Sequence, residues 1–311
     1  MERSVIRRQL IPDYAALHPG YQVGASLGRP VPTDGLRLAL VAAGAFAAKR
    51  APVQQAMFGE VIPRPSHFIN HSKHKLAQTP AGNGQMNVIT FASRKGGVGK
   101  STLTAHVSAF AHISGHRCVL IDADPQGSLT LWHTMRPNGA LPLRNAAQGI
   151  DRLVASAQID GAEWVFIDTA PTTWVVVQEA IRVATMVVIP VRPGFFDIAA
   201  VLDTVKTARE RNKPYAVVIN AAPVKREQKE APAVALTRAE FDRLSIPVWS
   251  GQISQRTAFL GSLAAGASAG EFNGDPACRT EIAGLWSAIE RSVEAINAAH
   301  AGSPDLRGEA A

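Results

Sequence analysis

The sequence predicts an α/β protein with a doubly wound, mostly parallel sheet and helices on both faces, preceded by a poorly ordered N-terminal extension. Three observations support this. From residue 86 onward, short apolar runs alternate with helix-competent stretches, as expected of strands that are buried on both faces. A glycine-rich loop separates the first apolar run from the first helix, and aspartates close two later runs. A chain of 311 residues, 46% of them apolar, is long enough to bury such a sheet.

Residues 1–85 differ in composition from the rest of the chain. They hold 8 prolines, 8 glycines and 10 Lys/Arg against 4 Asp/Glu, whereas the remaining residues hold 22 Lys/Arg against 21 Asp/Glu. The formal net charge of +7 therefore arises mostly in this leader. We expect a poorly ordered extension over 1–85, a folded domain over 86–300 and a disordered tail over 301–311. Translation from Met86 is the alternative, in which case the leader is an artefact of start-site choice.

Several features of the leader invite a functional interpretation. Its longest apolar run, at 38–48, is too short to span a bilayer. His67, His71 and His74 could form a metal cluster, but no acidic or cysteine ligand stands nearby, so a solvated basic segment is the preferred interpretation. The chain has two cysteines, Cys118 and Cys278, which cannot build a disulfide framework. We expect a reducing, cytoplasmic setting.

The expected elements follow the hydrophobic pattern in chain order. The expected strands are 88–91, 118–122, 164–168, 186–190, 215–220 and, more weakly, 246–250. The expected helices are 101–114, 143–157, 175–183, 198–211, 233–244 and 280–298, with Asp197 as the N-cap of the fourth. The last helix has one apolar face, whereas glutamates on its polar side would be repelled by anionic lipid. We therefore expect it to dock on the sheet of its own domain rather than on a membrane.

The glycine-rich loop has the context of a phosphate-binding loop, because a strand leads into it and a helix follows. Its glycines let consecutive amides face an anion, and the helix points the positive end of its dipole to the same place. Lys100 would reach the outer phosphates, and the Ser101 hydroxyl would bind Mg²⁺. The predicted nucleotide-binding residues of the loop are Gly96, Gly97, Val98, Gly99, Lys100, Ser101 and Thr102.

Polar side chains also end three of the predicted strands. Asp122 and Asp124 follow the second strand and Asp168 ends the third, where an aspartate is the expected outer-shell partner of magnesium. Asn220 ends the fifth strand, and its amide could recognise the edge of adenine or cap a turn.

The loop departs from the common G-x-x-x-x-G-K-[ST] pattern, because Arg94 stands in place of the first glycine and an extra lysine, Lys95, precedes the others. This arrangement resembles the deviant phosphate loop of the ParA/MinD family of P-loop ATPases. The resemblance implies that Lys95 reaches the nucleotide of a second subunit and couples ATP to dimerisation.

Two later runs strengthen the resemblance. Asp122-Ala-Asp124-Pro-Gln-Gly resembles the first switch of the family, and Asp168-Thr-Ala-Pro resembles the second. The family implies that Asp124 positions the attacking water and that Asp122 lies near the metal. The implied catalytic residues are Lys95, Lys100 and Asp124, and the implied metal-site residues are Ser101, Asp122 and Asp168. More weakly, the run Ile253-Ser-Gln-Arg256-Thr-Ala-Phe259 resembles the late Ile-x-x-Arg segment of the family, which implies that residues there support the nucleotide or the dimer.

The departures from other branches favour a ParA-like protein. Cysteines placed to bind an iron–sulfur cluster, a second phosphate loop, a tyrosine cluster and room for a glutaminase domain are all missing from the sequence. The resemblance implies a slow ATPase that uses ATP and Mg²⁺, forms an ATP-sandwich homodimer and holds non-specific DNA of the nucleoid, without a membrane partner. A ParB-like or other cargo adaptor would stimulate hydrolysis, and the cargo would be a plasmid or chromosome. A protein cargo and an ATP-dependent carboxylate-activating ligase are the alternatives.

Basic residues cluster in one part of the predicted domain. Residues 206–230 carry 7 basic and 3 acidic side chains, although the bland alternative is a solvated helix end and loop. The candidate DNA contacts are Lys206, Arg209, Arg211, Lys213, Lys225, Arg226 and Lys229.

Overall fold

The computed structural model describes residues 85–136, 141–146, 149–172, 174–272 and 274–301. The expectations for residues 1–84, including those for His67, His71 and His74, and for the tail from residue 302 lie outside the described residues. Within the described part, no helix has the length and apolar character needed to cross a membrane.

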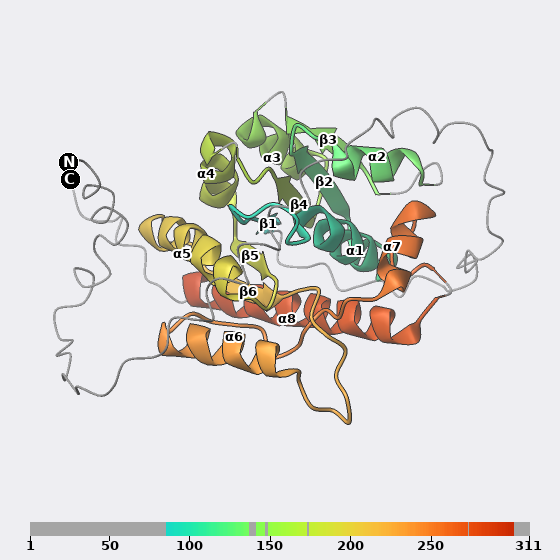
Figure 1. The fold of residues 1–311 in the computed structure, drawn as a ribbon. Helices are drawn as coiled ribbons and strands as arrows, with labels where there is room; N and C mark the ends of the chain where they lie inside the picture. Colours follow the sequence, from blue (N-terminus) through green and yellow to red (C-terminus); the bar gives the residue numbers. More distant parts are fainter. Residues whose placement is uncertain (1–84, 137–140, 147–148, 173, 273, 302–311) are drawn as a thin grey trace, which may run out of the picture. The chain divides into compact units, whose positions relative to one another are not determined.

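The described residues form one parallel sheet with helices between the strands (Figure 1). The strands are β1 (Asn87–Phe91), β2 (Cys118–Ala123), β3 (Leu143–Asn145), β4 (Trp164–Thr169), β5 (Met186–Val191) and β6 (Tyr215–Ile219). The helices are α1 (Lys100–Ile113), α2 (Ser128–Thr134), α3 (Ile150–Ile159), α4 (Trp174–Val183), α5 (Phe195–Glu210), α6 (Pro232–Arg243), α7 (Thr257–Ala264) and α8 (Pro276–Ala301).

The strand order is β3-β2-β4-β1-β5-β6, and every neighbouring pair is parallel. β1 lies inside the sheet, so the chain winds outward from it in both directions. Register pairs Phe91 with Asp168 and Asp122 with Asp168, which aligns the ends of β1, β4 and β2. The predicted doubly wound fold is confirmed, and its ligand crevice is expected at this carboxyl edge.

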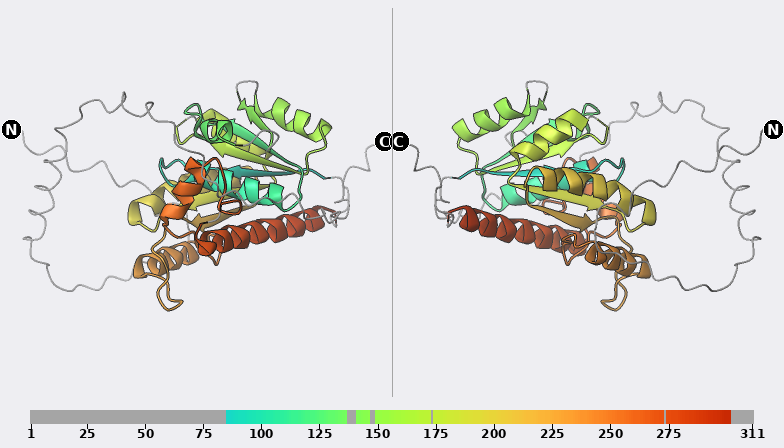
Figure 2. Two further views of the ribbon diagram at one scale, coloured as in Figure 1. Left: turned by 90° about the vertical axis from the view of Figure 1, so that its right-hand side faces the viewer. Right: turned by 90° about the vertical axis from the view of Figure 1, so that its left-hand side faces the viewer.

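The inner strands β1, β2, β4 and β5 are buried on both faces, because helices cover the sheet on two sides (Figure 2), whereas the edge strand β3 is only partly buried. On one side Ile89, Phe91 and Phe166 pack in a cluster with residues of α1 and α8. On the other side two clusters join the alternate strand residues, such as Val165 and Val187, to α3, α4 and α5. Burial on both faces explains why these strands are continuous apolar runs in the sequence.

Three of the expected elements are wrong in detail. Residues 143–145 are not the start of a helix but the edge strand β3, which pairs with β2 before Gly149 (φ 86°) begins α3. Residues 246–250 form a single bridge to Val217 rather than a strand. Asp197 is not the N-cap of α5, because Gly194 holds that position and Asp197 lies in the first turn. The helices α2 and α7 have no counterpart among the expected elements, since each is only seven or eight residues long.

Helix α8 docks on the sheet as expected. The residues that recur on its apolar face, among them Ile282, Leu285, Ile289 and Val293, are at most 2% exposed. They pack in the same cluster as α1 and the central strands. The apolar face that could have bound a membrane is thus covered by the protein's own core.

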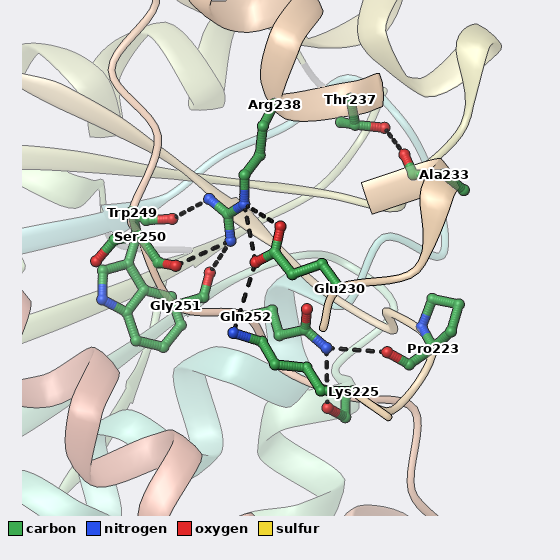
Figure 3. Close-up of polar contacts among 11 residues, drawn as sticks. Pro223, Lys225, Glu230, Ala233, Thr237, Arg238, Trp249, Ser250, Gly251 and Gln252 are labelled. Carbon is green, nitrogen blue, oxygen red and sulfur yellow. Dashed lines mark hydrogen bonds and ion pairs between the residues drawn. The ribbon is translucent and has the colours of Figure 1, made fainter. Parts of the chain in front are cut away.

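The segment between α6 and the carboxyl edge of the sheet is fixed by one arginine (Figure 3). Arg238 of α6 donates hydrogen bonds to the carbonyl oxygens of Trp249, Ser250 and Gly251, at 2.6–3.1 Å. Its Nε also donates to the Glu230 carboxylate. Within the described part of the chain, residues 246–250 make only two backbone hydrogen bonds to β6, both with Val217, and Arg238 adds three more to this chain before it reaches residues 253–256.

We expect Arg238→Ala to destabilise the protein by roughly 2 kcal/mol, because three carbonyls and a carboxylate lose their shared donor. The measurement is the free energy of unfolding in urea. Arg243→Ala on the same helix is the matched control, since its ion pair with Glu240 is solvent-exposed and should be worth less than about 0.5 kcal/mol. Equal losses in the two variants would contradict this role for Arg238.

Candidate functional site

The glycine loop connects β1 to α1 as the sequence predicts. Gly97 (φ 73°) and Gly99 (φ 96°) adopt left-handed backbone conformations, and Gly99 is the N-cap of α1. A Cβ on Gly99 would lie 2.1 Å from the Asn220 amide nitrogen, so no other residue fits there. The loop is closed on itself by Lys100, whose Nζ donates to the Lys95 carbonyl oxygen at 3.2 Å.

A cavity of about 480 Å³ opens beside this loop at the carboxyl edge of the sheet. Its lining brings together most of the predicted site residues: Gly96, Gly97, Gly99, Lys100, Ser101, Thr102, Asp124 and Asn220. The Val98 side chain is buried in the core, so only its backbone could face a ligand. Lys95, Asp122 and Asp168 do not line the cavity.

Burial dominates the electrostatics beneath the cavity. Lys100 is 6% exposed, and burial lowers its pKa, while the nearby Asp168 and Asp124 carboxylates act to raise it. Asp168 is fully buried, and burial raises its pKa to about 7, against the opposing effects of Ser101 and Lys100. Among the residues that the structure describes, no partner meets hydrogen-bond geometry with either oxygen of Asp168, although the nearby Ser101 hydroxyl acts to lower the pKa of this carboxyl.

An unpaired, buried carboxylate beside a serine hydroxyl is the arrangement that a magnesium ion would complete. Carboxylate and hydroxyl oxygens are the donors that Mg²⁺ prefers, and an orphaned buried charge otherwise costs several kcal/mol. The residues present therefore fit the ion. Ser101 and Asp168 are the groups that would hold it, directly or through water.

The two aspartates after β2 have different surroundings. The Asp122 carboxylate accepts hydrogen bonds from the backbone N–H and the hydroxyl of Thr130 and from the Asp124 N–H. Asp122 therefore stabilises the turn that leads into α2, and this structural role is independent of any role at a metal site. Asp124 accepts one bond from the Gln126 N–H and reaches the cavity, so its second oxygen is available for a ligand.

Asn220 connects the end of β6 to the glycine loop. It is 6% exposed, and its amide donates to the Val98 carbonyl at 2.7 Å. The side chain thus supports the loop in addition to lining the cavity. Both of the sequence interpretations, base recognition and local capping, are compatible with this position.

The predicted DNA contacts fall into two groups that lie at opposite ends of β6. Residues 206–213 belong to the end of α5 and the turn before β6, whereas residues 225–229 follow the carboxyl end of that strand. In the first group Arg209 donates to the Tyr215 hydroxyl and the Ser245 carbonyl, and Lys206 pairs with Glu210. In the second group Lys225 pairs with Glu230, while Arg226 and Lys229 are exposed. The structure does not bring the seven residues into one patch.

A model of the CobQ/CobB/MinD/ParA nucleotide binding domain matches residues 89–268, more than half of the chain. The chain belongs to this family. The ParA/MinD resemblance predicted from the loop and the two switch runs is confirmed. The ParA/MinD proteins of this family are P-loop ATPases, and the matched residues include the whole cavity lining.

Curated relatives match part of the chain. Maintenance of carboxysome distribution protein A of Gloeobacter kilaueensis is 33% identical over 39% of this chain and 56% of its own length. Protein ParA of Rhizobium radiobacter is 32% identical over 36% of this chain and 51% of its own length. The chain therefore spans about half the length of these relatives.

Solved structures share the fold of this family. Apo McdA of Cyanothece superposes with a TM-score of 0.55 at 15% identity, covering 66% of this chain and 100% of that one. MinD of Pyrococcus horikoshii, solved with Mg-ADP, gives a TM-score of 0.54 at 13% identity, covering 68% and 99%. At these identities the likeness establishes the fold.

The cavity lining includes Arg192, which follows β5 and which the sequence analysis gave no role. It also includes Ser254, Gln255 and Phe259, which belong to the 253–259 run that the weaker resemblance connects with the nucleotide or the dimer. Arg192 could have been found, because the rule that located Asp168 at the end of β4 applies equally to the end of β5.

One cavity residue is backed by a buried histidine. His106 of α1 is fully buried and lies edge-on to the Phe259 ring, and its Nδ1 accepts the Ala269 N–H at 3.1 Å. Burial lowers its pKa to about 4, with smaller raising effects from the Phe259 backbone and Glu271. The folded state therefore holds this imidazole neutral.

We expect this histidine to make stability depend on pH. Because its folded pKa lies below its unfolded value, the unfolded state binds more protons between about pH 6.5 and pH 4, so stability falls as the pH drops through that window. The loss should reach about 2 kcal/mol between pH 7 and pH 5. Asp168 contributes with the opposite sign, since its folded pKa is raised.

The His106→Asn variant separates the two contributions, because its amide oxygen can still accept the Ala269 N–H but does not titrate. Urea unfolding at several pH values should show a difference between wild type and variant that shrinks as the pH falls. A difference that stays constant from pH 7 to pH 5 would exclude this origin.

Proposed function

We propose that the chain is a ParA-like ATPase that forms an ATP-dependent dimer, binds DNA without sequence preference and positions a cargo. The observation that carries the proposal is the convergence of Lys100, Ser101 and Asp124 on one cavity beside a glycine loop, above the unpaired Asp168 carboxylate. This set supplies an anion cradle, a cation and metal-binding oxygens in one place.

Within that cavity the side chains divide the chemistry of hydrolysis. The loop amides and Lys100 hold the phosphates, and Asp124 orients the attacking water. Ser101 and Asp168 hold Mg²⁺, with Asp122 supporting the turn beside it. The bound ion would neutralise charge on the β- and γ-phosphate oxygens. Asn220 holds the loop and faces the nucleotide.

Lys95 is assigned to the second subunit's nucleotide. Its side chain does not line the cavity of its own subunit, although it is adjacent in sequence to Gly96, which does. A lysine at that position can place its charge outward, across a face-to-face dimer, where it would stabilise charge on the transferred phosphoryl group.

DNA binding is assigned first to the basic hairpin of residues 223–230. Glu227 and Gln228 form its left-handed turn, and Arg226 and Lys229 pair across it, so three cations are displayed on a short projection (Figure 1). Gln252 donates to the Pro223 carbonyl, which connects this hairpin to the cavity wall. The cations of the α5 end, Lys206, Arg209, Arg211 and Lys213, are the secondary candidates because several are engaged within the fold.

The cargo is proposed from the relatives. Their names point to chromosome or plasmid partition and to carboxysome distribution, so DNA and a protein assembly are the two candidate cargoes. In either case a ParB-like or other adaptor would stimulate hydrolysis, on the nucleoid in the cytoplasm. A carboxylate-activating ligase of the same fold would instead require a small acid for turnover and no DNA.

We expect Lys95→Ala to bind ATP with near-wild-type affinity but to fail in ATP-dependent dimerisation, and its turnover should fall by at least tenfold, because only the trans contact is lost. Lys100→Ala is the contrasting variant and should lose ATP binding itself. Calorimetry, light scattering and phosphate release measure the three properties. Dimerisation by Lys95→Ala at wild-type nucleotide concentrations would refute the trans assignment.

We expect the Lys225→Ala, Arg226→Ala, Lys229→Ala triple variant to weaken ATP-dependent DNA co-sedimentation and to lower the slope of log affinity against log salt by about 2 to 3, one phosphate contact per residue. The matched control removes three exposed arginines elsewhere, at positions 152, 279 and 291. If both triple variants lose the same affinity, binding reflects net charge and not this hairpin.

A further inference from the structure

Among the described residues, three cationic side chains line the cavity beside the glycine loop, and two of them already have partners within the protein. Arg256 pairs with Asp275 at 2.8 Å and lies 3.5 Å from Glu281. Lys100 is buried among the carboxylates of Asp168 and Asp124 and donates to the Lys95 carbonyl. The third cation is Arg192.

Arg192 has no such commitment. Its side chain is exposed, and within the part of the chain that the structure describes its guanidinium has no hydrogen-bond or ion-pair partner. It follows the end of β5, the strand next to β1, so it stands beside the start of the glycine loop. Pro193 and Gly194 then lead directly into α5. Among the described residues, the Arg192 side chain therefore makes no polar contact that would stabilise the fold.

A bound polyphosphate beside two carboxylates would carry more negative charge than Lys100 and one Mg²⁺ together balance. Asp124 lines the cavity and Asp168 lies beneath it, so a polyphosphate entering the cavity meets negative charge as well as the loop amides. A guanidinium offers five N–H donors in a planar fork that can bind two phosphate oxygens together, and it stays charged at any pH of interest. An unpaired arginine at the cavity is thus the group best suited to the remaining charge.

We propose that Arg192 binds the phosphate chain of the nucleotide in its own subunit, as a cation additional to Lys100 and to the trans lysine Lys95. The proposal rests on the nucleotide-binding function proposed above and names a further residue of that site. Arg192 acts in cis because it lines the cavity formed by its own subunit. It is exposed without a ligand and becomes ordered when phosphate oxygens reach it.

The test measures the affinities of the full chain for ATP, ADP and AMP by calorimetry, in wild type, Arg192→Ala and Arg192→Lys. Because charge-assisted bonds to phosphate are lost, Arg192→Ala should weaken ATP binding by about tenfold, ADP binding less and AMP binding least. Arg192→Lys should recover part of the loss, since charge remains but the fork does not. Arg152→Ala removes an exposed arginine from α3 and is the matched control.

The same comparison in a Lys95→Ala background decides between cis and trans. A tenfold effect of Arg192→Ala that persists in this dimerisation-deficient background supports the cis contact, and an effect that disappears there overturns it. An equal loss for ATP, ADP and AMP, or no loss, also overturns the proposal. If wild type itself binds no nucleotide, the proposed function fails, which is a different outcome from a wild type that binds ATP and an Arg192→Ala variant that binds it equally well.

Discussion

The candidate site depends on buried charged side chains at the end of β4 and the start of α1, which the other described residues leave without full partners. Asp168 is buried at the end of a central strand with neither oxygen hydrogen-bonded, and Lys100 is buried beside it. A buried carboxylate without partners lowers the stability of the fold. The same burial raises the pKa of Asp168, because it disfavours the charged form. The surrounding residues keep Asp168 and Lys100 in fixed positions beside one cavity, where a metal ion and a polyphosphate could bind them.

A few side-chain hydrogen bonds hold the residues of the site in place. Thr130 and the chain after β2 fix Asp122, and Asn220 fixes the glycine loop through the Val98 carbonyl. Arg238 holds the chain leading to residues 253–256, which form one wall of the cavity. Gln252, which directly precedes these cavity residues, donates a hydrogen bond to the Pro223 carbonyl of the basic hairpin. One chain segment therefore borders the cavity and contacts the hairpin. A change at either end has a short structural route to the other.

Much of the fold could be predicted from the sequence, because strands buried on both faces read as short apolar runs and the glycine loop has a fixed context. The errors have physical causes. Residues 143–145 form a strand because β2 has an open edge to pair with, and residues 246–250 are held by a single bridge to β6 together with Arg238 of α6. The tertiary contacts of these two segments leave no local signal. Arg192 belongs to no motif, but its place directly after β5 could have marked it, because functional side chains collect at the carboxyl ends of parallel strands.

The most direct test of the account is the melting temperature of the full chain with ATP, with Mg²⁺ and with both, in wild type and in Asp168→Asn. Binding stabilises the folded state in proportion to affinity, so the shift reports the completed site. The account predicts that Mg²⁺ enlarges the shift caused by ATP in wild type and adds little in Asp168→Asn. An equal magnesium increment in the two proteins would contradict the claim that the unpaired Asp168 carboxylate is kept for the metal.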